Sequence, residues 1–158
     1  MRRPWNIVDS PVSSIATYDA DGMVNMNICT YMMAISRKPK LYCISIENCS
    51  KTLDNILRSE ECVIQILSEP QAKLVRPLGK KSGFDYDKQN YLEKRELLHS
   101  WKGFKVLKDS CAYIHFNVQN QQEVGDHILF TGAANSFKTI KEEGILTFKY
   151  LVDNGIIL

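Results

Sequence analysis

The sequence predicts a mainly β domain, folded as a barrel or a sandwich with a few short helices. Short runs rich in β-branched and aromatic residues recur along the chain, and turn residues separate them. The two helical patterns do not alternate regularly with these runs, which argues against a doubly wound parallel sheet. The expected strands cover residues 12–18, 23–36, 41–46, 62–67, 112–118, 127–134 and 145–152.

Turn-forming residues separate the first three strands. Asp21-Gly22 follows the first strand, and an Asp-Gly pair supplies the positive φ that a tight hairpin turn requires. Pro39 marks the break between the second and third strands, since proline cannot donate to a strand ladder. The run at 112–118 alternates apolar and more polar positions, which predicts one buried face made of Ala112, Ile114, Phe116 and Val118.

Two segments have the periodicity of short helices, and one long segment has neither pattern. Residues 50–58 present an apolar face, and either Ser50 or Thr52 can cap the helix. Residues 69–78 form a weaker helical pattern, which Pro77 interrupts near its end. Residues 80–99 are polar and rich in lysine and aspartate, so we expect a long excursion over the surface, of the kind that often carries function.

The composition is that of an ordinary globular protein, and its 158 residues fit a single domain, 1–158. The net charge of +2 gives no basic patch for nucleic acid. The N-terminus lacks the apolar core of a signal peptide, and no apolar stretch approaches the roughly 20 residues that cross a bilayer. Five cysteines without a CxxC pair indicate buried thiols in a reducing cytosol. We therefore expect a cytoplasmic protein that binds neither nucleic acid nor membranes.

Several catalytic motifs are absent from the sequence. No HExxH or comparable His/Cys spacing exists, so no metal site is expected. No GxSxG elbow indicates acyl transfer, and no GxGxxG follows a strand as in a Rossmann dinucleotide site. The lysine-rich loop at residues 79–88 lacks the GxxxxGK[ST] order of a P-loop, which argues against nucleotide hydrolysis.

A strand end followed by a helix start, at residues 45–52, is the first candidate site. Free N–H groups and the positive end of the helix dipole make such a helix start a natural phosphate site. Ser50 and Thr52 would add hydroxyl donors, and Lys51 would add a charge. The same residues also fit an ordinary helix cap.

Two further segments carry residues suited to binding. The loop at 79–88 combines a Ser-Gly turn with three lysines, which either close over an anion or remain solvated. His127 follows Gly125 and Asp126 at a strand start, where a histidine donates a hydrogen bond or a proton near neutral pH, or serves the fold alone.

In this order along the chain, these segments resemble the flavin reductase-like family, whose fold is a split β-barrel of Greek-key topology that binds FMN. The resemblance runs from about Pro11 to Gly132, and the Val-Gly-Asp-His element that ends at His127 is its most telling part. The matching segments are residues 11–22, 25–36, 39, 41–46, 50–56, 65–69, 82–83 and 123–127.

The resemblance implies a role for each matching segment. Residues 30–33 would line the isoalloxazine, residues 45–46 would lie below the ring and ribityl chain, and residues 50–52 would hold the phosphate. His127 would lie near the ring, where nicotinamide stacks, as an orienting donor. The family commonly holds the flavin at the interface of a homodimer. The implied cofactor-binding residues are Thr30, Tyr31, Met32, Met33, Ser45, Ile46, Ser50, Lys51, Thr52, Ser82, Gly83 and Lys88.

The function implied is an FMN-binding, NAD(P)H-dependent flavin oxidoreductase that passes a hydride from nicotinamide to flavin and electrons on to a small-molecule or protein acceptor. Tyr31-Met32-Met33 is bulkier than the family pattern, which keeps a non-enzymatic FMN-loaded carrier or sensor open as an alternative. A split barrel for haem or a pyridoxal compound and a plain interaction domain are further alternatives. Cys29, near the expected ring position, is a redox thiol or a buried filler.

Overall fold

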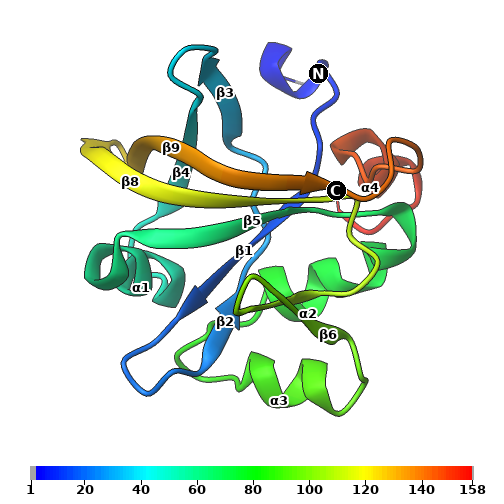
Figure 1. The fold of residues 1–158 in the computed structure, drawn as a ribbon. Coiled ribbons are helices and arrows are strands. Elements are labelled where there is room, and N and C mark those ends of the chain that lie inside the picture. Colours follow the sequence, from blue (N-terminus) through cyan, green and yellow to red (C-terminus); the bar gives the residue numbers. More distant parts are fainter. Residues whose placement is uncertain (1–2, 158) are drawn as a thin grey trace.

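A computed structural model describes residues 3–157, and its central feature is a seven-stranded antiparallel sheet in the order β2-β1-β5-β8-β9-β4-β3 (Figure 1). Strands hold 43% of the chain and helices 23%, which confirms the predicted mainly β class. A separate hairpin, β6–β7, packs beside the sheet. The strands are β1 (Ser13–Tyr18), β2 (Val24–Met26), β3 (Met32–Ser36), β4 (Leu41–Glu47), β5 (Glu61–Ile66), β6 (Leu98–Trp101), β7 (Phe104–Leu107), β8 (Ala112–Val124) and β9 (His127–Thr139).

Residues 27–31, the barrel-closing segment, join the two edge strands β2 and β3 and tie the sheet into a barrel. Cys29 exchanges two backbone hydrogen bonds with Ser13 of β1, with N···O distances of 2.9 and 2.8 Å. The carbonyl of Tyr31 accepts from the N–H of Ser45 in β4 at 2.9 Å. The prediction of one continuous strand at 23–36 is therefore wrong. The barrel-closing segment interrupts it, because the backbone of this segment forms hydrogen bonds with β1 and β4, which lie near opposite edges of the sheet.

Short helices and 3₁₀ turns surround the barrel. The expected helix at 50–58 is confirmed as α1, and Ser50 caps it by accepting from the N–H of Leu53 at 3.1 Å. Pro77 does not interrupt α2, because it is the third residue, where the N–H has no intrahelical acceptor. No helix within residues 3–157 is long and apolar enough to cross a membrane. The elements are η1 (Pro4–Asn6), α1 (Lys51–Ser59), η2 (Glu69–Leu74), α2 (Val75–Gly79), α3 (Lys88–Glu93) and α4 (Phe148–Asp153).

The predicted last strand, at 145–152, is wrong. The chain forms isolated bridges at Ile145 and Thr147 and then turns into α4, where Thr147 Oγ1 caps the helix by accepting from the N–H of Tyr150 at 3.2 Å. A short apolar run fits helix and strand periodicity almost equally, so the cap decides between them.

The segment at 80–99 is more ordered than expected. Asp87 Oδ1 accepts from the N–H of Asn90 at 2.8 Å and starts α3, and β6 begins at Leu98. The irregular parts are therefore the loop between α2 and α3, which lies beside β2, and a short turn at residues 94–97.

Two hydrophobic clusters hold these elements in place. The first fills the barrel, and α1 covers it with Leu53 and Ile56. The second lies between the sheet and the layer of α2, α3 and the β6–β7 hairpin. β8 contributes to both, since Phe116 is buried in the first and Tyr113 in the second. The apolar face predicted for β8 is thus only one of the two faces of this strand that pack in a core. The start of α1 faces the loop after α2.

Candidate functional site

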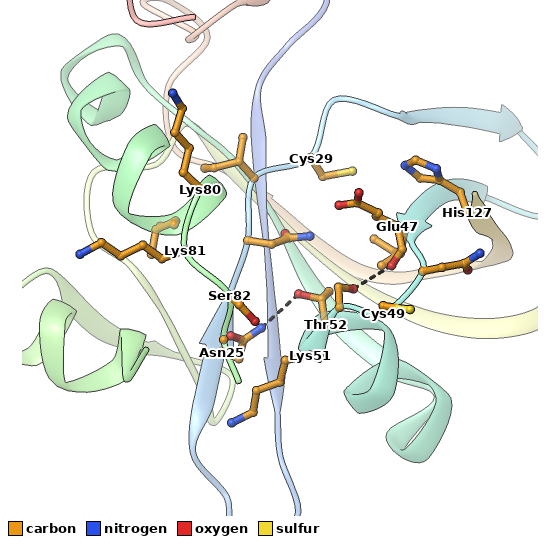
Figure 2. A pocket seen from close by; sticks show the side chains of 18 of the residues that line it. Asn25, Cys29, Glu47, Cys49, Lys51, Thr52, Lys80, Lys81, Ser82 and His127 are labelled. Carbon is orange, nitrogen blue, oxygen red and sulfur yellow. Dashed lines mark hydrogen bonds between the residues drawn. The ribbon is translucent and has the colours of Figure 1, made fainter. Parts of the chain in front are cut away.

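A cavity of about 510 Å³ opens between the start of α1, the barrel-closing segment and the loop after α2 (Figure 2). The end of β4 and the start of β9 complete its wall. These two ends are held together because the N–H of Asn48 donates to the carbonyl of Asp126 at 2.9 Å. The cavity therefore collects residues that are far apart in the chain.

The first turn of α1 presents backbone donors to this cavity. Ser50 Oγ accepts from the N–H of Leu53 and donates to the carbonyl of Glu47 at 2.9 Å, so its hydroxyl serves the helix cap. The N–H groups of Lys51 and Thr52 come too early in the helix to have intrahelical acceptors, and both residues line the cavity. Together with the positive end of the helix dipole, these groups suit a bound phosphate.

A buried polar network orients the side chain of Thr52. Asn25 Nδ2 donates to Thr52 Oγ1 at 3.1 Å, while Asn55 Nδ2 donates to Thr17 Oγ1 at 2.9 Å. Thr17 Oγ1 in turn donates to the Asn25 carbonyl at 3.4 Å. All four residues are at most 4% exposed. Because Thr52 Oγ1 accepts from Asn25, its hydroxyl hydrogen remains available to a molecule in the cavity.

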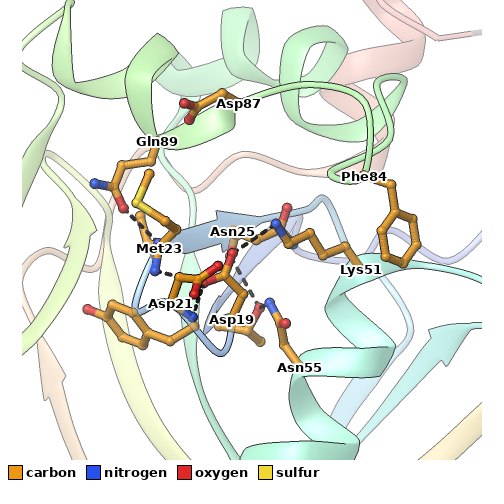
Figure 3. A network of polar contacts seen from close by, with 12 residues as sticks. Asp19, Asp21, Met23, Asn25, Lys51, Asn55, Phe84, Asp87 and Gln89 are labelled. Atoms are coloured by element: carbon orange, nitrogen blue, oxygen red, sulfur yellow. Dashed lines mark hydrogen bonds and ion pairs between the residues drawn. The ribbon is translucent and has the colours of Figure 1, made fainter.

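Lys51 extends from the start of α1 toward the β1–β2 turn (Figure 3). Its Nζ lies 3.0 Å from Asp19 Oδ2, and Asp19 Oδ1 accepts from the N–H groups of Asp21 and Met23 at 3.0 and 2.9 Å. Burial opposes the ionisation of Asp19, but the Lys51 ammonium and the two N–H groups outweigh it and hold the pKa of Asp19 below its usual value. The lysine charge predicted for the phosphate is thus already paired.

The loop after α2 approaches α1 and β2 most closely at Gly83. A Cβ at this position would lie 2.1 Å from Asn25 Oδ1 and 3.2 Å from Lys51 Cβ, so a larger residue would push the loop outward. Ser82 precedes it on the cavity wall, and its Oγ accepts from the N–H of Phe84 at 3.2 Å. Glycine is therefore required here for close approach.

Lys88 anchors the far end of this loop at the start of α3. Its Nζ donates to the carbonyls of Met26 and Leu78 at 2.9 and 2.7 Å, which ties α3 to β2 and α2. The residue is 5% exposed, and burial lowers the pKa of Lys88 to about 8. An ammonium has three donors, so one remains for the cavity that Lys88 lines.

His127 stands on the cavity wall away from Lys51 (Figure 2). Its Nδ1 lies 2.6 Å from Asp126 Oδ1, and this hydrogen bond lowers the pKa of Asp126. Its ring is packed against Tyr31, with centroids 5.4 Å apart and a tilt of 53°. With Nδ1 engaged, Nε2 is the ring nitrogen available to a bound molecule.

Two cysteines border the cavity in different states. Cys29 is 7% exposed, its Sγ lies 3.8 Å from the carbonyls of Tyr31 and Ser45, and burial raises the pKa of Cys29 to about 11. It is therefore a packed thiol at neutral pH, since thiolates are the reactive form. Cys49, which precedes the α1 cap, is exposed.

All the predicted site residues except Met32 and Met33 line this one cavity. Met32 packs against the barrel core, and Met33 is 60% exposed on edge strand β3. Asn25 and Asp19 are site candidates that the sequence does not reveal, because each acts on a residue 27 or more positions away. Within residues 3–157, no cluster of three or more His, Cys, Asp or Glu is placed to hold a metal.

The protein-family model of the flavin reductase-like domain matches residues 1–151 of this chain. The chain belongs to the flavin reductase-like family. The resemblance stated from the sequence is thereby confirmed, and this flavin reductase-like protein contains the family's domain over nearly its full length. No curated protein matched the chain in a sequence search.

Solved structures similar to this flavin reductase-like protein include two flavin reductases. Flavin reductase PheA2 is 28% identical with a TM-score of 0.74, over 91% of this chain and 88% of that one. The styrene monooxygenase flavin reductase of Pseudomonas putida is 16% identical with a TM-score of 0.77, over 91% and 89%. An FMN-binding protein from Thermus thermophilus is 21% identical with a TM-score of 0.75, over 91% and 78%. Family and neighbours support a flavin-related oxidoreductase function.

Proposed function

We propose that this flavin reductase-like protein binds FMN and oxidises NAD(P)H, passing electrons on to a small-molecule or protein acceptor. The observation that carries the proposal is the start of α1, where the N–H groups of Lys51 and Thr52 and the oriented Thr52 hydroxyl meet at one cavity. FMN ends in a phosphate, the group that a helix N-terminus binds readily.

The residues present fit this cofactor. A cavity of about 510 Å³ falls within the size range of small-molecule sites, roughly 300–1,000 Å³. Bound FMN would supply the hydride acceptor. Thr30, Tyr31, Ser45 and Ile46 would line the ring and ribityl chain, and residues 82–83 would cover them from the loop. His127 would orient a nicotinamide through Nε2, and no protein base is needed for hydride transfer itself.

We also propose a homodimer with the flavin at its interface, in the cytoplasm. Edge strand β3 and the residue before it expose apolar side chains, with Tyr31 58%, Met33 60% and Ile35 45% exposed. Tyr31 both belongs to this apolar edge and lines the cavity, so a partner docked there would reach the cofactor. Sedimentation of wild type and Met33→Glu tests this, since a monomeric wild type would contradict it.

The experiment that tests the activity begins with FMN titration of the apoprotein, followed by anaerobic stopped-flow mixing of the FMN-loaded protein with NADH and NADPH. We expect FMN to bind and the visible absorbance of the oxidised flavin to bleach with one of the two donors. His127→Ala should slow bleaching more than Asp126→Asn, which keeps the imidazole. A protein that is colourless after unbound FMN has been removed by gel filtration would refute the proposal, and a haem or pyridoxal spectrum of the purified protein would point to those ligands.

A second candidate is an FMN-loaded carrier or sensor that does not react with NAD(P)H. The contact of Tyr31 with His127 favours it, because the tyrosine ring then occupies the side of the cavity proposed for nicotinamide. A carrier would keep its yellow colour in the stopped-flow experiment, and Tyr31→Ala would restore bleaching.

A further inference from the structure

A second cavity, of about 370 Å³, adjoins the proposed FMN site. The two cavities share Asn25, Lys51, Gly83 and Lys88, so the second begins where the wall at the start of α1 ends. If a flavin is held by its phosphate at Thr52, any group attached beyond that phosphate would enter the second cavity. FMN ends there, whereas FAD continues with a second phosphate and an adenosine.

The walls of the second cavity are acidic. It is lined by three carboxylates, those of Asp19, Asp85 and Asp87, and its described lining contains two cationic side chains, those of Lys51 and Lys88. Lys51 Nζ is paired with Asp19 at 3.0 Å, and Lys88 Nζ uses two of its three donors on backbone carbonyls. A second phosphate entering here would therefore meet three carboxylates against two ammonium groups, one of which is already paired with Asp19.

Asp19 is the most firmly placed of these carboxylates (Figure 3). The N–H groups of Asp21 and Met23 fix its Oδ1, and Lys51 fixes its Oδ2. The turn that carries it is closed by a hydrogen bond from the N–H of Asp19 to the carbonyl of Met23 at 3.0 Å, and Gly22 adopts a φ of +77°. Asp19 lines the second cavity but not the first, so its charge acts on a second phosphate more than on a terminal one.

We propose that Asp19, held against Lys51, makes this site select a flavin with a single terminal phosphate over FAD. The inference rests on the proposed flavin-binding function. A second phosphate would bring further negative charge to a wall with more carboxylates than ammonium groups, and like charges repel most strongly where water is partly excluded. FMN should accordingly bind at least about fivefold more tightly than FAD.

The test measures the dissociation constants of FMN and FAD by quenching of flavin fluorescence on the apoprotein. Asp19→Asn keeps an oxygen for the turn but removes the charge, so FAD affinity should rise more than FMN affinity and the preference should narrow to about twofold or less. Asp21→Asn, in the same turn but outside both cavity linings, should leave the preference unchanged.

A second measurement uses the wild-type protein alone, so it does not depend on a variant that folds. Raising the salt from 20 mM to 1 M screens exposed charges, and the FMN preference should shrink. Equal binding of FMN and FAD by wild type, or an Asp19→Asn preference equal to that of wild type, would overturn this inference while leaving flavin binding intact. Binding of neither flavin would overturn the proposed function as well.

Discussion

The hydroxyl of Thr52 offers the sharpest test of the proposed phosphate site. Thr52→Val keeps the β-branched shape but removes the donor that Asn25 orients into the cavity. A hydrogen bond to a charged group is worth about 1.5–3 kcal/mol, so FMN should bind roughly 10- to 150-fold more weakly. Riboflavin lacks the phosphate, and its affinity should not change.

The same substitution also affects stability, and a matched control separates the two effects. Without Thr52 Oγ1, the buried Asn25 Nδ2 has no acceptor, which costs about 1–3 kcal/mol of unfolding free energy. Thr17→Val leaves Asn55 Nδ2 in the same position but lies outside the cavity lining. Both variants should lose similar stability in urea unfolding, while only Thr52→Val lowers the FMN-to-riboflavin affinity ratio. An equal loss of FMN and riboflavin affinity in Thr52→Val would refute the reasoning.

Three further predictions follow from the packing around the cavity. Gly83→Ala should weaken FMN binding in a fluorescence titration, because its Cβ would fall 2.1 Å from Asn25 Oδ1; unchanged affinity would show that the loop plays no part in binding. Burial lowers the pKa of Lys88 from 10.5 to about 8, so between these two pH values the unfolded chain binds more protons than the folded protein. The free energy of unfolding of the wild type should therefore rise from pH 8 to 10.5, relative to that of Lys88→Met. Urea unfolding of both proteins at the two pH values checks this. When the protein is labelled with iodoacetamide at about pH 8 and analysed by mass spectrometry, the exposed Cys49 should react first and Cys29 should stay unlabelled. Bound FMN should slow the labelling of Cys49, which lines the cavity. Early labelling of Cys29 would contradict its burial.

The sequence predicted those features of the cavity that depend on residues close together in the chain. The Ser50 cap and the helix start after β4 are local features, since a cap and the donors it leaves free lie within a few residues of each other. The hairpin at Gly22 and the strand that begins at His127 are equally local. These segments, taken in order, were enough to indicate the family and most of the cavity lining.

The errors in secondary structure arose where a local pattern was ambiguous. The run at 145–152 is apolar enough for a strand, but it forms isolated bridges at Ile145 and Thr147 and then continues as the capped helix α4. The run at 23–36 looked continuous because strand propensity continues through it. Its interruption at the barrel-closing segment depends on hydrogen bonds to β1 and β4, which are distant in sequence.

By itself, the sequence determined the mainly β class, the family and the segments that form the wall of the cavity, because propensity, turns and helix caps are local properties. Only the tertiary structure decided what those residues can do there. It paired Lys51 with Asp19, gave Thr52 its orientation through Asn25, and buried Lys88 between two carbonyls. A side chain's charge and donors depend on its neighbours in space, and in a closed barrel those neighbours come from distant parts of the chain.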